Sequence, residues 1–166
     1  MGHGPRFRMP LKRRLKGKTN YRNRLNLIKS GKVRAVVRRS NRYMMIQLVK
    51  YRPEGDEVVL TFTSDKLKSY GWEGSGNNVP ASYLAGFIAG KKAVKMGIEE
   101  AVLDIGMNIP EHNGKFFAAL KGMIDAGVDI PHNPSVLPDE DRLTGKHINE
   151  DVVKMFESVK KDLEEL

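Results

Sequence analysis

The chain has 166 residues, with 29 lysines and arginines against 20 aspartates and glutamates, which gives a formal net charge of +9. A hydrophobic content of 40% and a charged content of 30% are typical of a folded domain and exclude wholesale disorder. The absence of cysteine excludes disulfide scaffolds, thiolate metal sites and cysteine nucleophiles, and it fits a reducing compartment. The length allows one domain with a real core but not two large ones.

The charges are segregated along the chain. Residues 1–53 hold 17 lysines and arginines and no acid, whereas residues 54–166 hold 12 basic and 20 acidic side chains. A block of like charge repels itself, and its usual partner is a polyanion, most often a nucleic acid and less often an anionic membrane. The first third of the chain is therefore predicted to bind a polyanion.

A membrane is the weaker of these two partners. The longest apolar run, residues 83–90, is far shorter than the roughly 20 residues that a membrane helix needs. The first residues lack the apolar segment of a secretory signal, and Arg6 stands where myristoylation needs serine or threonine. We therefore expect a cytoplasmic protein without membrane contact.

The first predicted elements are an arm and a helix. Residues 1–18 combine prolines and glycines with seven basic side chains, which predicts an extended arm without a core of its own. Thr19 can cap a helix that runs to about Ser30, with Gly31 as its stop. The apolar stripe by which this helix can dock comprises Tyr21, Leu25 and Ile28. The basic residues of this helix that lie outside the apolar stripe are Arg22, Arg24 and Lys29.

Three strand-like segments follow, over residues 33–40, 43–51 and 57–63. Only Asn41 and Arg42 separate the first two, which predicts a tight hairpin. A turn with proline, glycine and aspartate leads to the third segment. We therefore expect an antiparallel meander of three strands.

Helices and one further strand make up the rest of the chain. Helices are expected over residues 65–70, 80–96 and 115–126 and from Asp151 onward, with loops over 71–79 and 128–149. Residues 101–106 are a continuous apolar run, which predicts a central strand. The expected buried side chains are Leu84, Phe87, Ile88 and Val94 on the long helix and Val152, Phe156, Val159 and Leu163 on the last helix.

This order of elements predicts an α/β fold class. The sheet should be mixed, with the antiparallel meander and a βα unit, and helices should pack on it. We expect a basic extended RNA-binding arm over residues 1–18, a single α/β domain over 19–149 and a C-terminal amphipathic helix over 150–166.

The sequence shows no combination of side chains that is typical of a catalytic site. The glycines of residues 74–76 lack the rest of a phosphate-binding loop, and the four histidines lack zinc-type spacing. Acidic runs such as residues 139–141 are usually solvated surface. A two-metal nuclease needs carboxylates gathered on neighbouring strands, but the predicted strands carry only Glu57 and Asp104. We therefore expect no enzyme, no metal and no cofactor.

Nucleic-acid binding accounts for more of the sequence, because arginine contacts phosphate in a bidentate manner and stacks on bases. In the arm and first helix the candidate contacts are Arg6, Arg8, Arg13, Arg14, Arg22 and Arg24, interleaved with Phe7 and Tyr21. Each of the two rings either stacks on a base or packs on the body. At the hairpin the candidates are Arg38, Arg39, Ser40, Asn41, Arg42 and Tyr43, unless this is an ordinary solvated turn.

RNA is favoured over DNA as the partner. The sequence has no zinc finger, zipper or plain helix-turn-helix pattern, and no strand with aromatic residues of the RNP type. An extended basic arm on a folded body suits a structured RNA, because the arm can thread between RNA helices and become ordered on binding.

Six long motifs occur in order and together cover most of the chain. They are GPRFRMPLKRRLKGKTNYRNRL (4–25), VRRSNRYMMIQLV (37–49), GWEGSGNNVPASYLAG (71–86), GIEEAVLDIG (97–106), FAALKGMIDAGVDIPHN (117–133) and LPDEDRLTGKHI (137–148). With these motifs the chain resembles the archaeal/eukaryotic type of the large-subunit ribosomal protein that binds 5S rRNA, number eighteen in the universal scheme.

The resemblance implies a structural protein of the ribosome. Members of this family have a mixed α/β fold similar to the ribonuclease H motif but without its catalytic carboxylates. They lie in the central protuberance of the large subunit, where they hold 5S rRNA and attach it to the large rRNA. The implied partners are therefore 5S rRNA, large-subunit rRNA and neighbouring ribosomal proteins, with no small-molecule substrate.

The family's RNA-contacting motifs can be carried onto this chain. In the arm and first helix they fall on Arg6, Arg8, Lys12, Arg13, Arg14, Lys16, Lys18, Tyr21, Arg22 and Arg24. In the hairpin they fall on Arg38, Arg39, Ser40, Asn41, Arg42 and Gln47, and in the following loop on Trp72, Asn77 and Asn78. Tyr43-Met44 stands where the family often has His-Ile, and tyrosine can still stack and donate one hydrogen bond there.

Two alternative functions stay open. A general RNA chaperone would bind 5S rRNA and unrelated RNA equally. A metal-dependent nuclease, which the scarcity of strand carboxylates disfavours, would cleave RNA in a manner that depends on Asp104.

Overall fold

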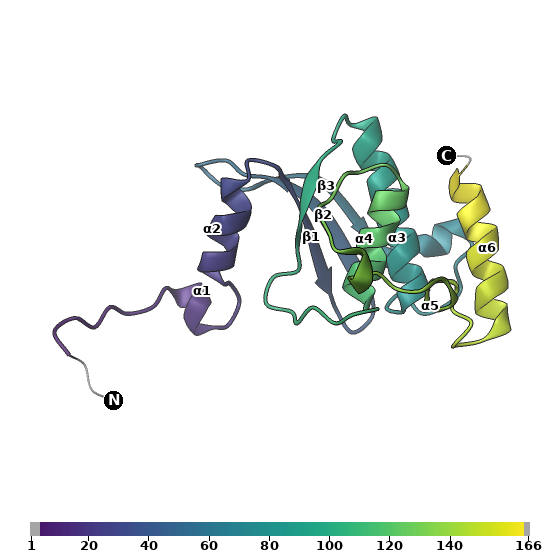
Figure 1. Cartoon of the computed structure of the whole chain (residues 1–166), viewed down its shortest axis with the longest axis horizontal. Coiled ribbons are helices and arrows are strands. Elements are labelled where there is room, and N and C mark those ends of the chain that lie inside the picture. Colours follow the sequence, from purple (N-terminus) through teal and green to yellow (C-terminus); the bar gives the residue numbers. More distant parts are fainter. Residues whose placement is uncertain (1–3, 165–166) are drawn as a thin grey trace.

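A computed structural model describes residues 4–164 (Figure 1). The helices are α1 (Lys12–Leu15), α2 (Tyr21–Lys29), α3 (Val79–Lys95), α4 (Lys115–Asp125), α5 (Glu140–Thr144) and α6 (Glu150–Glu164). The strands are β1 (Val33–Arg39), β2 (Met44–Lys50), β3 (Glu57–Thr63) and β4 (Ala101–Asp104). Two 3₁₀ helices are η1 (Ser64–Tyr70) and η2 (Pro134–Val136).

The four strands form one mixed sheet in the order β3-β2-β1-β4. β2 pairs antiparallel with both β1 and β3, and β4 pairs parallel with β1 after the chain has crossed over through α3. The predicted fold class, an antiparallel meander and a βα unit with packed helices, is therefore confirmed. The predicted strand bounds also agree with the observed ones within one or two residues.

The prediction that the strand at 101–106 is central is wrong, because β4 forms one edge of the sheet. Its outer side is nevertheless covered near its start. The Ala101 amide donates to the Asp129 carbonyl at 3.0 Å, and the Asp129 amide donates to the Glu99 carbonyl at 2.8 Å. A covered edge can carry the apolar side chains that an exposed edge strand would have to avoid.

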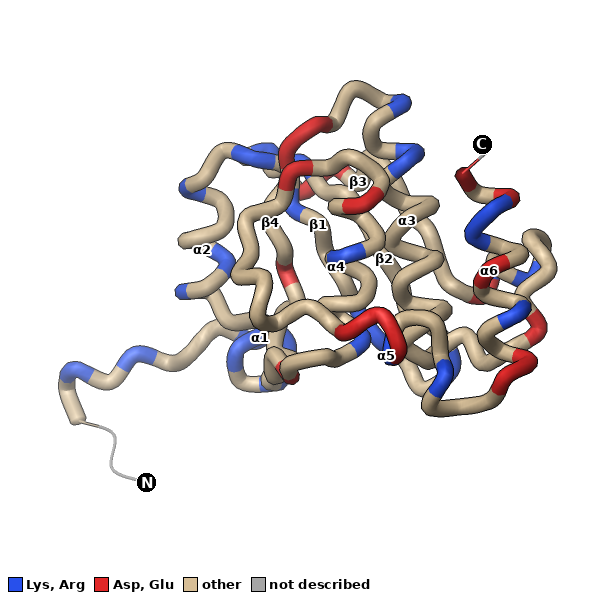
Figure 2. The backbone as a smooth tube through the Cα atoms, turned by 45° about the vertical axis from the view of Figure 1, so that its right-hand side comes forward, with Lys and Arg blue, Asp and Glu red and all other residues tan. Residues whose placement is uncertain are grey.

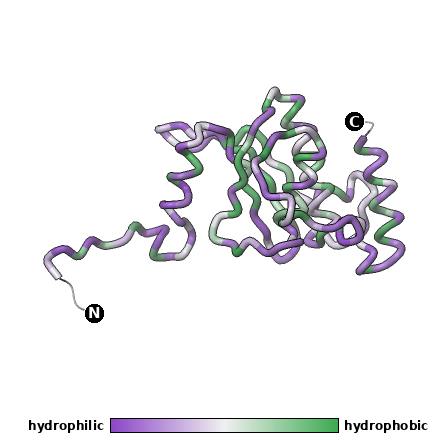
Figure 3. The backbone as a smooth tube through the Cα atoms, viewed as in Figure 1, coloured by the Kyte–Doolittle hydropathy of each residue, from purple (hydrophilic) through white to green (hydrophobic). Residues whose placement is uncertain are grey.

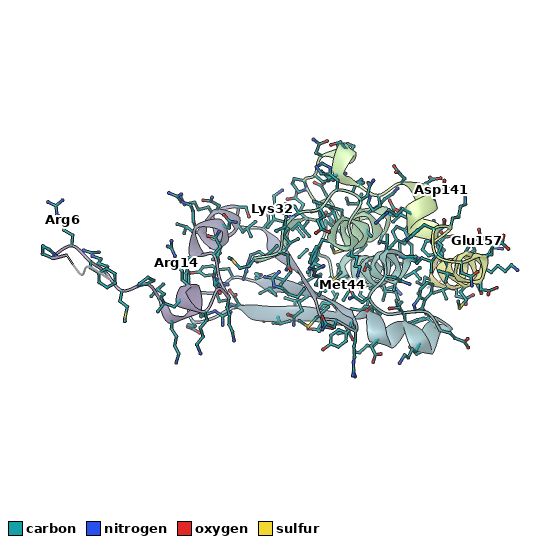
Figure 4. All side chains as sticks on the ribbon, turned by 90° about the horizontal axis from the view of Figure 1, so that it is seen from below. Arg6, Arg14, Lys32, Met44, Asp141 and Glu157 are labelled. Carbon is teal, nitrogen blue, oxygen red and sulfur yellow. The ribbon has the colours of Figure 1, made fainter. Side chains whose placement is uncertain are left out.

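The sheet has one covered face and one open face. Side chains alternate along a strand, so Ala35 and Val37 of β1 lie in the hydrophobic core together with Ile46 and Leu48 of β2. α3 and α4 cover this face, and α6 lies on the far side of them (Figures 1 and 4). α2 lies on the opposite side of the sheet (Figure 1). Figure 3 shows hydrophobic positions gathered in the sheet, α3 and α4, whereas the arm and α2 are mostly hydrophilic.

The two central helices approach each other closely through glycines. A Cβ atom at Gly86 of α3 would lie on the carbonyl of Ala119, and one at Gly122 of α4 would lie on the carbonyl of Tyr83. Both contacts involve backbone atoms, which cannot rotate away. Burial raises the pKa of Tyr83, and its hydroxyl donates to Asp125 of α4 at 2.8 Å.

Two expectations for the second half of the chain need correction. Val94 is 42% exposed rather than buried, because α3 is enclosed on all sides only as far as Gly90. The segment 128–149 is not only loop, since it contains η2 and α5, and Leu143 of α5 is buried. The expected buried stripe of the last helix is confirmed, with Val152, Phe156, Val159 and Leu163 all buried.

Candidate nucleic-acid interface

The basic and acidic parts of the chain lie at opposite ends of the molecule. Figure 2 shows lysines and arginines along the arm, α1 and α2, whereas α5 and α6 carry many of the acids. In Figure 4, Arg6 and Arg14 lie at one end and Asp141 and Glu157 at the other. The segregation in sequence is therefore also a segregation in space.

The arm has no buried residue between Gly4 and Lys18. It is mostly irregular, but α1 adds one turn of helix that the sequence did not predict. All the predicted contacts on the arm lie at the surface, namely Arg6, Phe7, Arg8, Lys12, Arg13, Arg14, Lys16 and Lys18. Arg13 Nε donates to Thr19 Oγ1 at 2.8 Å, which ties α1 to the segment before α2.

The cap of α2 is Asn20 and not Thr19. The Asn20 side-chain oxygen accepts hydrogen bonds from the amides of Arg22 and Asn23, while Thr19 is occupied with Arg13. An asparagine in extended conformation one residue later serves the same purpose as a threonine cap. The predicted stop at Gly31 is confirmed, because Gly31 has a φ of 69°, which glycine adopts without strain.

The side by which α2 faces the body agrees only in part with the predicted one. Tyr21 and Ile28 of the predicted stripe are half-buried, whereas Leu25 is 53% exposed and does not dock. Arg24 and Leu27 instead line the side that faces the sheet, and no residue of α2 is buried. Arg24 donates to Asp56 Oδ2 at 2.8 Å. A short helix with so little apolar burial depends on such tertiary contacts for its position.

Five charged side chains form a chain of ion pairs between α2 and the open face of the sheet. We call it the arginine–aspartate network, and its members in order are Arg24, Asp56, Arg34, Asp104 and Arg38. Arg34 is only 3% exposed. Its Nη2 donates to Asp56 Oδ2 at 2.6 Å and its Nη1 to Asp104 Oδ2 at 3.2 Å. Arg38 Nη2 donates to Asp104 Oδ1 at 2.9 Å.

The network sets the protonation of Asp56. Burial alone would raise the pKa of this carboxyl group, but the hydrogen bonds from Arg34 and Arg24 outweigh burial and hold the pKa below its usual value. Asp56 therefore stays ionised, and it neutralises part of the charge of the basic first third. Two predicted RNA contacts, Arg24 and Arg38, consequently already have carboxylate partners within the protein.

The β1–β2 hairpin is a hydrogen-bonded turn that presents polar groups. Ser40 Oγ accepts from the amides of Arg42 and Tyr43 at 3.2 and 3.0 Å. Asn41, Arg42 and Tyr43 are exposed at the tip. Arg39 is exposed as well, with its guanidinium 5.9 Å from the centre of the Phe116 ring. Ser40 therefore shapes the turn, and its neighbours form the accessible surface.

The loop after η1 supports this hairpin from behind. Asn77 Nδ2 donates to the carbonyls of Ser40 and Asn41 at 3.0 and 3.3 Å. A Cβ atom at Gly76 would lie 3.0 Å from the Arg42 carbonyl, so glycine permits the close approach. Asn78 is the N-cap of α3, accepting from the Ala81 amide at 2.8 Å. The Asn77 amide nitrogen and the Asn78 amide oxygen are thus used within the protein, whereas Asn77 Oδ1 is buried without a hydrogen-bond partner among the described residues.

Trp72 is not part of the accessible surface, which corrects the prediction that it contacts RNA. Its side chain belongs to the hydrophobic core and is 1% exposed. The indole Nε1 donates to the Ser75 carbonyl at 3.2 Å. The prediction came only from the resemblance to the family, and in this structure the loop folds over its own ring.

A cleft with a volume of about 490 Å³ separates α2 from the open face of the sheet. It brings together several of the predicted contacts, since Arg13, Lys18, Arg24, Arg38 and Gln47 all line it. Gln47 Nε2 donates to Thr61 Oγ1 on the neighbouring strand at 3.1 Å. The hairpin tip, by contrast, does not line the cleft and forms a second surface.

Asp104, on which a nuclease would depend, is a member of the network. It accepts hydrogen bonds from Arg34, Arg38 and the Gly106 amide. Within residues 4–164, no three histidine, aspartate or glutamate side chains gather to hold a metal ion. In the same range no helix has the length and apolar character to cross a membrane.

Reasoning from the sequence missed Arg34 and Asp56, which join α2 to the sheet. The sequence contains an indication for Arg34, because side chains alternate between the two faces of a strand. This alternation places Arg34 with Val36 and Arg38 on the face of β1 opposite to Ala35. No local signal pairs Asp56 with Arg34, since their contact depends on the order of the strands.

Known proteins resemble this chain over most of its length. Residues 5–100 match the family model described as ribosomal large subunit proteins 60S L5, and 50S L18. The chain is 50% identical over 149 residues to the large ribosomal subunit protein uL18 of Aeropyrum pernix, which covers 89% of this chain and 70% of the relative. It is 48% identical over 148 residues to uL18 of Korarchaeum cryptofilum, with 89% and 76% covered. It is 50% identical over 150 residues to uL18 of Halobacterium salinarum, with 90% and 82% covered. The chain therefore belongs to the uL18 family of large ribosomal subunit proteins, which confirms the resemblance found in its motifs.

Proposed function

We propose that this protein binds 5S rRNA and attaches it to the large rRNA in the central protuberance, as a structural component without catalytic activity. Membership of the large ribosomal subunit, with its cytoplasmic location and its role in translation, follows from the family. The finer assignment to 5S rRNA is supported by the charge and the exposure of the first third of the chain.

The observation that carries this proposal is the exposed, acid-free arm. Seven lysines and arginines between Arg6 and Lys18 are all at the surface, and the segment has no buried residue among those described. Cations on such a segment bind phosphates with release of counterions, which gives affinity without requiring a preformed pocket. Arg22 on the exposed side of α2 extends the same surface.

The hairpin tip offers a second contact of a different kind. Asn41 and Arg42 supply hydrogen-bond donors, and Tyr43 has 39% of its surface exposed. An aromatic ring beside an arginine suits an unpaired base, which can stack on the ring while the arginine contacts phosphate. Two separate RNA-binding surfaces are what a protein that joins two RNA molecules needs.

The full chain is expected to bind 5S rRNA in preference to an unrelated RNA of equal length. Competition binding at increasing salt measures both properties. With six or more phosphates neutralised, the affinity should fall about a thousandfold between about 50 and about 200 mM salt. If the unrelated RNA competed as well as 5S rRNA, the result would support a general chaperone instead. An affinity that does not change with salt would contradict the proposal.

The substitution Arg42→Gln is expected to weaken 5S rRNA binding several-fold and to reduce the salt slope by about 1, since one phosphate contact is lost. Lys161→Gln is the matched control, because Lys161 is an exposed cation on the acidic helix α6. It should leave both values unchanged. An equal effect of the two substitutions would mean that only the net charge matters and that the hairpin is no specific contact.

A further inference from the structure

The cleft between α2 and the open face of the sheet combines three kinds of surface. Val49 and Val58 line it on the sheet side, Asn26 lines it on the α2 side, and Arg13 and Lys18 line it at the base of the arm. Apolar side chains suit the flat face of a base, amides suit its polar edge, and cations suit its phosphate. These are the components of a nucleotide site.

The charge around the cleft favours an anionic ligand. Five lysines and arginines line it against two carboxylates, those of Asp56 and Asp104. Both carboxylates belong to the arginine–aspartate network and are held by arginines there. The excess of cations is therefore left for a ligand that brings its own negative charge.

Two polar atoms of the network have unused hydrogen-bonding capacity at this cleft. Arg34 is 3% exposed, yet its Nε has no hydrogen-bond partner within the described part of the chain. Arg24 and Arg34 both donate to Oδ2 of Asp56, and no hydrogen bond from residues 4–164 reaches Oδ1. A buried donor without a partner is destabilising, and this applies to Arg34 Nε alone. Asp56 lines the cleft with its side chain 24% exposed, so its Oδ1 is open to a hydrogen bond from a ligand.

The shape of the cleft limits what that ligand can be. Its volume of about 490 Å³ lies within the range of about 300–1,000 Å³ typical of pockets for small ligands. A base-paired RNA helix is too thick to enter between α2 and the sheet. A single nucleotide turned out of its strand is small enough, and unpaired bases are the parts of RNA that proteins read specifically.

We propose that this cleft binds one unpaired nucleotide of the bound rRNA, with its base against Val49 and Val58 and its phosphate beside Arg13 and Lys18. Oδ1 of Asp56 is then available to accept a hydrogen bond from an N–H group on the base edge. The proposal rests on the RNA binding proposed above. It adds a site at which the protein recognises an RNA feature in addition to binding phosphates.

The absence of native cysteines permits a direct test in the full chain. Val58→Cys places a thiol in the cleft, and Ser158→Cys is the matched control, an exposed position on α6 outside the cleft. Each variant is measured before and after reaction with N-ethylmaleimide, so that each serves as its own reference. The probes are 5S rRNA and a fully paired RNA duplex of similar length.

Blocking the thiol of Val58→Cys is expected to weaken 5S rRNA binding about tenfold, which corresponds to the loss of one stacked base, and to leave duplex binding unchanged. The same reaction on Ser158→Cys should change neither affinity by more than about twofold. Bound 5S rRNA should also slow the reaction of N-ethylmaleimide with Val58→Cys, whereas bound duplex should not.

Asn26→Cys on the α2 side of the cleft is a second blocking position should Val58→Cys fold poorly, and it is expected to behave in the same way. Unchanged 5S rRNA binding after blocking overturns the nucleotide site, as does an equal loss for the duplex. Failure of the unmodified full chain to bind 5S rRNA at all overturns the proposed function instead, so the two failures are distinguishable.

Discussion

Removal of residues 1–18 is expected to lower the affinity for 5S rRNA about a hundredfold at about 0.2 M salt and to leave the body folded. The deleted segment carries seven lysines and arginines. Each cation that neutralises a phosphate releases a counterion, and contact by about half of them accounts for a loss of this size. No described residue of the segment is buried, so the free energy of unfolding should change by less than about 1 kcal/mol.

Equilibrium binding across a salt series and thermal unfolding measure these two effects. The matched control keeps the arm but replaces its seven cations with glutamine, which separates charge from chain length. We expect it to lose nearly as much affinity as the truncated chain and to show the same reduced salt slope. If the truncated chain bound 5S rRNA as well as the full chain, the assignment of the arm to RNA binding would be wrong.

The elements of the fold could be predicted wherever local signals agreed with one another. β1 and β2 alternate and are joined by two residues, and Gly31, Gly71, Gly97 and Gly127 stand where helices end, each with a positive φ. The position of β4 could not be predicted in this way. Its apolar run would suit a central strand, and only the pairing of residues 99–101 with Asp129 shows how an edge strand can be covered.

The site was predicted at the level of segments but less well at the level of side chains. The arm and hairpin tip are exposed as expected, whereas Trp72 is in the core and Asn77 supports the hairpin from within. On α2, helical periodicity favoured Leu25 as a docking residue, but an ion pair with Asp56 turns Arg24 toward the sheet instead. Periodicity describes apolar burial, and it carries no information about a charged contact between segments distant in sequence.

The network also changes the meaning of the charge segregation. From the sequence, all the cations of the acid-free third were expected to be available to a partner, but two carboxylates from the rest of the chain pair with three of them. Arg24, Arg34 and Arg38 share Asp56 and Asp104, so these arginines are largely neutralised by the protein itself. The cations that remain for RNA lie mainly on the arm, on the outer side of α2 and at the hairpin tip, which is why the arm should dominate binding.

The substitution Arg34→Met is expected to lower the free energy of unfolding by about 3 kcal/mol. Arg34 is 3% exposed and bridges Asp56 and Asp104, so methionine would leave a buried carboxylate with a partner missing. Breaking a buried ion pair costs more than the pair contributes, because the remaining charge is still desolvated. Urea unfolding followed by circular dichroism measures the change.

Arg52→Met is the matched control for this prediction, since Arg52 pairs with Glu57 at 2.6 Å but both side chains are about half exposed. An exposed pair of this kind should contribute less than about 1 kcal/mol. In the double variant Arg34→Met/Asp104→Asn the second substitution removes a carboxylate that has lost one of its two arginine partners. The destabilisation of the double variant should therefore be smaller than the sum of the two single effects. Full additivity, or equal effects of Arg34→Met and Arg52→Met, would show that Arg34 does not hold the open face of the sheet together through its carboxylate partners.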